Sequence, residues 1–143
     1  MSAVLFAGGA ASALAYIDTA VSVATFLLSE RLPATVQNIR AFFTRQKVEP
    51  PAGFSPDEAA GLVGLLVIDE GLLKDLTHRV RDAIEGYRAC LRKAVRTQES
   101  DACDRRAERD ICDTLNRIRN RNKGKLPTDF LKGQWDSYEC VEV

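Results

Sequence analysis

Residues 70–94, EGLLKDLTHRVRDAIEGYRACLRKA, decide the fold class of this chain. Apolar side chains recur in this stretch at spacings of three and four, with charged side chains between them. The apolar positions are Leu73, Leu76, Val80, Ala83, Tyr87, Cys90 and Ala94. This spacing places them on one face of a helix with 3.6 residues per turn. The stretch therefore predicts a long helix that is solvated on one side and packs in a bundle on the other.

A second long helix is expected to follow. Ser100 can cap its beginning, and Gly124, after Asn122 and Lys123, can end it. Its apolar stripe consists of Cys103, Ala107, Ile111, Leu115 and Ile118. Together the two helices predict an antiparallel hairpin within residues 55–125.

The residues before the hairpin divide into a helix and a linker. Ser55-Pro56-Asp57-Glu58 has the pattern of a capping box with proline in the first turn, so a helix should begin there. Gly71 after Asp69 predicts a break near residues 68–71. Residues 48–54, VEPPAGF, contain consecutive prolines and cannot continue a helix. We expect them to form the linker.

Residues 1–47 are expected to form apolar N-terminal helices. The first has an apolar stripe of period about 3.5, namely Ala10, Leu14, Ile17, Val21, Ala24 and Leu28. Pro33 suits the first position of a second, shorter helix. The buried face of that helix should contain Leu32, Val36, Ile39 and Phe43.

The last segment, residues 126–143, predicts a short aromatic helix. Leu126-Pro127-Thr128-Asp129 combines a turn with a helix cap, and Phe130, Leu131, Trp135 and Tyr138 follow at helical spacing. This segment should cover one end of the bundle. Because no stretch alternates with period two and no repeat is visible, the sequence predicts one all-α domain over residues 1–143, a compact bundle of four to six helices.

Composition excludes two broad classes. A chain of 143 residues with 45% hydrophobic residues can bury a core, so it is not disordered as a whole. Twenty basic and twenty acidic residues cancel, which leaves no global attraction to nucleic acid or anionic membranes. Only seven of these forty charges lie in residues 1–56.

The sequence contains no pattern that predicts catalysis or cofactor binding. Its one histidine, His78, lies within the long helix, and no serine sits in a glycine-rich elbow. The carboxylates of Asp110 and Asp113 lack an accompanying Glu-x-x-His pattern. The glycines do not have phosphate-loop spacing. We therefore expect no catalytic, cofactor or metal site, and no enzyme activity.

Four cysteines, Cys90, Cys103, Cys112 and Cys140, leave two interpretations open. Without a Cys-x-x-Cys pair they argue against a zinc site. Cys90 could pair with Cys103 across the hairpin turn, and Cys140 could fold back on Cys112. Alternatively, all four are buried thiols in a reducing cytoplasm. An export signal begins with basic residues, and no Lys or Arg precedes Arg31 in this sequence. We therefore expect free thiols and a cytoplasmic protein.

One local cluster is strongly basic. It spans residues 117–125 and contains Arg117, Arg119, Arg121, Lys123 and Lys125. Such a cluster could bind the phosphates of nucleic acid or lipid. It could equally complement the negative end of the helix macrodipole, at about 0.3 to 1 kcal/mol for each charge. We favour the structural interpretation and do not expect nucleic acid as a partner.

The nearly uncharged first helix allows two interpretations of its own. It is either a central core helix or an association surface for a second copy, another protein subunit or membrane lipid. The predicted association surface comprises Gly8, Ala11, Leu14, Ala15, Ile17 and Ser22. The segment is long enough to cross a bilayer, although Asp18 would oppose insertion by about 2.5 to 3.5 kcal/mol.

The sequence AGGAASALAYIDTAV at residues 7–21, followed by Phe26-Leu27-Leu28, is similar to a known family. Over residues 3–43 it resembles the HeLo-type and mixed-lineage-kinase-like four-helix bundles of cell-death effectors. The resemblance implies oligomerisation and membrane disruption by the N-terminal helix.

From these observations we expect a non-catalytic protein that acts by association through its N-terminal helix, in the cytoplasm or at a membrane. The alternative is a small intracellular enzyme or nucleic-acid-binding protein that uses residues 117–125.

Overall fold

A computed structural model describes residues 9–143, and the described part of the chain is all-helical. This confirms the predicted fold class. The helices are α2 (Gly9–Glu30), α3 (Val36–Gln46), α4 (Pro56–Ile68), α5 (Glu70–Lys93), α6 (Thr97–Arg121) and α7 (Asp129–Ser137). One hydrophobic core draws side chains from all of them.

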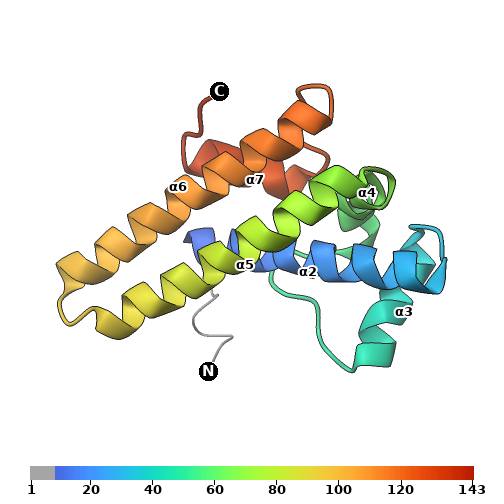
Figure 1. The fold of residues 1–143 in the computed structure, drawn as a ribbon, viewed down its shortest axis with the longest axis horizontal. Helices are drawn as coiled ribbons and strands as arrows, with labels where there is room; N and C mark the ends of the chain where they lie inside the picture. The colour runs from blue at the N-terminus through green and yellow to red at the C-terminus, as the bar shows by residue number, and fades with distance from the viewer. Residues whose placement is uncertain (1–8) are drawn as a thin grey trace.

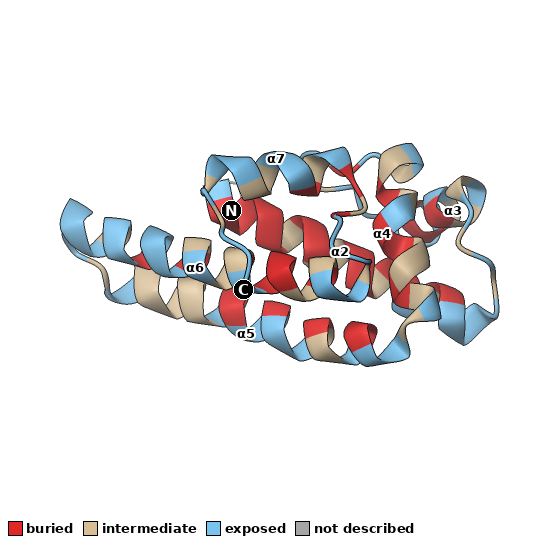
Figure 2. Ribbon diagram, turned by 90° about the horizontal axis from the view of Figure 1, so that it is seen from above, coloured by how far each residue is buried: buried red, intermediate tan, exposed pale blue. Residues whose placement is uncertain are grey.

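The predicted hairpin is formed by α5 and α6, which run antiparallel and are joined at residues 94–96 (Figure 1). Helix α2 packs against α4, α5 and α6 and lies at the centre of the bundle. Buried residues concentrate along it (Figure 2), and Leu14, Ile17 and Leu27 have no exposed surface. Since burying one such side chain contributes about 1.5 to 3 kcal/mol, α2 anchors the core.

Two helix beginnings differ from the sequence prediction. Helix α3 begins at Val36 rather than Pro33, because the Thr35 side chain caps it by accepting a hydrogen bond from the Asn38 backbone N–H at 3.1 Å. Helix α6 begins at Thr97, so Ser100 is not its cap. The Glu99 carboxylate instead accepts from the backbone N–H groups of Val95 and Arg96, each at 2.8 Å. A carboxylate near a helix start is favoured by the macrodipole as well.

The capping box expected at Ser55 is also wrong, although α4 does begin at Pro56. The Ser55 side chain makes no capping hydrogen bond. Glu58 turns into the fold, where its carboxylate accepts from the Tyr16 hydroxyl and from the Phe130 backbone N–H, both at 3.2 Å. Glu58 therefore connects α4 to α2 and α7.

The predicted linker and break are both present. Residues 48–54 contain no helix. Helix α4 ends at Ile68, and the Asp69 side chain caps α5 by accepting from the Leu72 backbone N–H at 3.0 Å. A short polar side chain at the break thus replaces the hydrogen bond that the interrupted helix loses.

Helix α7 packs against α2 and α6. The Phe130 ring stacks on the Tyr16 ring with centroids 4.2 Å apart, and Phe54 from the linker lies 5.1 Å from the Tyr16 ring. Burial raises the pKa of the Tyr16 hydroxyl well above its usual range. The aromatic contact fixes α7 and the linker on the same side of α2.

Candidate functional site

All four cysteines are disulfide-bonded, so the prediction of free thiols is wrong for this structure. Cys90 pairs with Cys103, with Cα atoms 5.7 Å apart, and Cys112 pairs with Cys140, with Cα atoms 5.3 Å apart. The antiparallel hairpin places the first pair on facing sides of α5 and α6. The chain after α7 returns along α6 and brings Cys140 to Cys112.

The predicted association surface on α2 is largely internal. Ala11, Leu14 and Ile17 are buried, while Ala15 and Ser22 are half-buried; Gly8 lies outside the described residues. Helices α4, α5 and α6 occupy the space that a partner would need. The prediction of a surface at the three buried positions is therefore wrong, and α2 is the central helix of the alternative interpretation.

Helix α2 also satisfies the length and hydropathy of a membrane span. Its 22 residues are long and apolar enough to cross a bilayer, yet 61% of its most apolar stretch is buried inside the fold. The same composition suits the core helix of a soluble bundle.

Asp18 is the charged residue in the middle of α2. Its carboxyl lies at a cavity of about 260 Å³ between α2 and α5, whose lining includes Arg81, Ile84 and Arg88. Burial raises the pKa of the Asp18 carboxyl, and the two arginines oppose that shift. The arginines explain how a carboxylate is tolerated beside the core.

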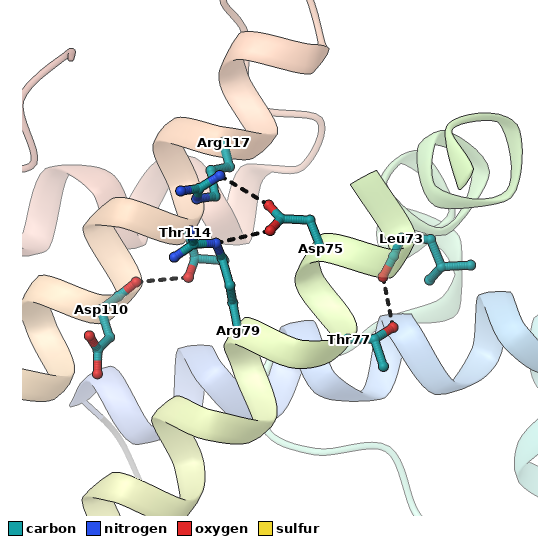
Figure 3. Close-up of polar contacts among 7 residues, drawn as sticks. All are labelled: Leu73, Asp75, Thr77, Arg79, Asp110, Thr114 and Arg117. Carbon is teal, nitrogen blue, oxygen red and sulfur yellow. Dashed lines mark hydrogen bonds and ion pairs between the residues drawn. The ribbon is translucent and has the colours of Figure 1, made fainter. Parts of the chain in front are cut away.

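The arginines of the basic cluster are engaged in ion pairs. Arg117 contacts Asp75 at 3.2 Å, and Arg121 contacts Asp69 at 2.6 Å. Asp75 also accepts from Arg79 at 3.0 Å, so one carboxylate joins two arginines on different helices (Figure 3). These contacts connect α6 to α5, which favours the structural interpretation of the cluster.

Arg119, the third arginine, holds the C-terminal residues. It contacts Glu142 at 3.4 Å, and its guanidinium lies 4.8 Å from the centre of the Trp135 ring. The two lysines of the cluster, Lys123 and Lys125, are exposed. Two free ammonium groups make a weak phosphate site compared with the five charges counted in the sequence.

The C-terminal residues form a strap along α6. Asn116, which is buried, donates a side-chain hydrogen bond to the Val141 carbonyl at 2.9 Å and accepts one from the Val143 backbone N–H at 3.2 Å. The Cys112–Cys140 disulfide fixes the beginning of the strap. The spacing of the cysteines indicated that Cys140 could pair with Cys112. It gave no sign of the role of Asn116, because the hydrogen-bond partners of Asn116 lie 25 and 27 residues away in the sequence.

A feature that sequence reasoning missed is a groove between α5 and α6, which we call the hairpin groove. The groove is lined by one row of residues on α5 and one on α6, and in both rows successive residues are three or four positions apart. We call these rows the α5 stripe and the α6 stripe. The α5 stripe contains Arg79, Asp82, Gly86, Ala89 and Lys93, and the α6 stripe contains Glu99, Ala102, Arg106, Asp110 and Asp113. The groove has a cavity of about 190 Å³ at its polar end and one of about 560 Å³ at its small-residue end.

The hairpin groove faces away from α2. Ile84 of α5 lines the cavity against α2, and at 100° per residue Gly86 lies about 160° around the helix from it. The glycines and alanines of the groove were visible in the sequence. What could not be seen is that they share one hollow, because the hollow exists only once two helices pair.

Charges are unevenly placed along the hairpin groove. Burial raises the pKa of the Asp110 carboxyl, Arg106 opposes the shift, and the neighbouring Asp113 adds to it. Within residues 9–143, no ion pair involves Asp82, Asp113 or Lys93. The polar end thus contains three carboxylates beside Arg79 and Arg106, and Lys93 lies at the other end.

The end of the hairpin is fixed by its own contacts. The Tyr87 hydroxyl donates to the Asp104 carboxylate at 2.7 Å, close to the Cys90–Cys103 disulfide. Burial, together with Asp104, raises the pKa of Tyr87 to about 12. The phenol therefore remains a hydrogen-bond donor at neutral pH.

Comparison of the chain with protein-family models, curated proteins and solved structures finds no match, and the resemblance of residues 3–43 to cell-death effector bundles stays a prediction.

Proposed function

We propose that this chain is a non-catalytic helical module that acts by binding protein through the free end of its α5–α6 hairpin. The observation that carries the proposal is the projection of this end beyond α2 and the other helices, visible in two perpendicular views (Figures 1 and 2). Residues 86–91 are only half-buried there. An apolar and small-residue surface without a covering helix is typical of a protein contact.

The position of the first disulfide supports this proposal. Cys90 lies in the last turn of α5 and Cys103 in the second turn of α6, and neither belongs to the core cluster around α2. This disulfide therefore adds little to the packing of the core, but it fixes the position of α5 relative to α6 at the projecting end of the hairpin. A surface that is rigid before it binds loses less conformational entropy on binding.

The two disulfides also bear on where the protein works. No free cysteine remains among the described residues. Disulfides persist in oxidising compartments and are rare in the cytoplasm of most cells. We therefore favour an oxidising compartment over the cytoplasm that the sequence suggested.

Site-specific photo-crosslinking tests the proposed function. A photoreactive residue at Ala89 or Ala102 in the groove should capture protein in the cells that make the chain, whereas one at Gln37 on α3, exposed on a different part of the molecule, should not. Capture at neither groove position, or equal capture at all three, would overturn the proposal.

A further inference from the structure

We propose that the hairpin groove binds the same groove of a second copy of this chain, with the two α5 helices antiparallel. This inference rests on the proposed function and names the partner.

From Asp82 to Lys93 the α5 stripe is self-complementary under a two-fold rotation. Asp82 stands near one end and Lys93 near the other, and the point halfway between them is also halfway between Gly86 and Ala89. When a second copy is rotated by 180° about this point, its Lys93 faces Asp82 and its Asp82 faces Lys93. The dimer therefore contains the same ion pair twice, as an isologous interface requires.

The α5 residues in the middle of the stripe are small. Under the same rotation Gly86 of one copy faces Ala89 of the other, so no large α5 side chain separates the two helices. Arg106 of α6 extends over Gly86, with its Nη2 atom 3.4 Å from the position a Cβ would take, so this guanidinium has to move aside before the α5 helix of a second copy can approach. Small residues at a helix crossing permit interaxial distances near the short end of about 8 to 10 Å.

Charges on α6 determine which helix makes the contact. Glu99 and Asp113 each lie seven residues from Arg106 along the α6 stripe. A two-fold rotation about Arg106 would therefore place Glu99 of one copy opposite Asp113 of the other, and two acidic side chains would meet. Facing α6 helices are disfavoured for this reason, and α5 is left as the contacting helix. A contact from Asp82 to Lys93, about 16 Å along one helix, predicts a weak dimer rather than an obligate one.

A charge-swap experiment tests the pairing. Oxidised wild-type protein should sediment as a concentration-dependent dimer, whereas Asp82→Lys and Lys93→Glu should each weaken dimerisation about tenfold or more because like charges then meet. An equimolar mixture of the two variants should recover the dimer, since each then offers the charge that the other lacks. Circular dichroism establishes that every variant remains helical.

Matched controls use exposed charges outside the groove, Lys74→Glu and Asp136→Lys. They change the net charge equally and should leave dimerisation unchanged. A wild type that is monomeric at every concentration, or a mixture no heavier than its components, would overturn the self-pairing. If photo-crosslinking at Ala89 then still captured a protein of a different mass, the proposed function would stand and only the choice of partner would fall.

Discussion

Gly53 occupies a position in the linker that no other residue fits well. Its φ is +80°, and a Cβ placed there would collide with the Phe130 ring, which itself stacks on Tyr16. Gly53→Ala should therefore destabilise the fold by about 1 to 3 kcal/mol, through backbone strain and displacement of the ring. Urea unfolding measures the change.

Gly133 in α7 provides the control. A Cβ there meets no atom within 4 Å, so Gly133→Ala should leave stability unchanged or raise it by up to about 1 kcal/mol. Equal effects at the two glycines would show that the ring contact with Phe130 does not limit position 53.

Asp18 predicts a pH dependence with a definite sign. Because burial raises its pKa in the folded chain, the ionised carboxylate opposes folding at neutral pH. Asp18→Asn should therefore be more stable than the wild type above the folded pKa, and this advantage should be lost as the pH falls toward the ordinary aspartate value. Unfolding midpoints at several pH values test it. A variant less stable at neutral pH would mean that attraction to Arg81 and Arg88 outweighs burial.

The helices themselves followed from the sequence, and so did the Thr128 cap of α7, but the beginnings or caps of α3, α4 and α6 did not. Apolar spacing predicts α5 and α6, and Asp69 before Gly71 predicts the break between α4 and α5. Whether a residue caps a helix depends on which hydrogen-bond partner its side chain finds. Glu58 has partners on α2 and α7 that local sequence cannot reveal, so the expected capping box gives way to tertiary contacts.

The redox state of the cysteines and the role of α2 could not be predicted for different reasons. Spacing gave a geometry in which Cys90 could meet Cys103, but whether the bond forms depends on the compartment. An apolar helix such as α2 has the same composition in a core, a membrane or an interface. Only the position of its neighbours decides between them.

Each disulfide should protect its own element. Replacing Cys90 and Cys103 together by Ser should raise amide hydrogen exchange near the hairpin end, with α2 still protected, because that disulfide lies outside the core around α2. Replacing Cys112 and Cys140 together should instead raise exchange in residues 138–143. Each variant is the control for the other. Uniformly faster exchange along the chain in both would contradict the separation of the two elements.

The central position of α2 predicts how the whole molecule behaves toward lipid. Its apolar side chains already pack inside the bundle, so exposing them to a bilayer requires much of the core to open. The folded, oxidised protein should therefore cause no dye leakage from anionic or neutral vesicles. Leakage that survives Leu14→Glu would come from another part of the chain, and leakage that this variant abolishes would revive the membrane role suggested by the resemblance.

The order of the chain has a consequence for biosynthesis. Helix α2 is made before its partners, because Ile111 and Ile118 of α6, which share its core, follow about a hundred residues later. At about 5 to 20 residues per second, the ribosome needs roughly 5 to 20 s to supply them. For that time this long apolar helix is a nascent segment without those partners, so a chaperone or a targeting factor that binds apolar nascent helices would meet α2 before the fold can bury it.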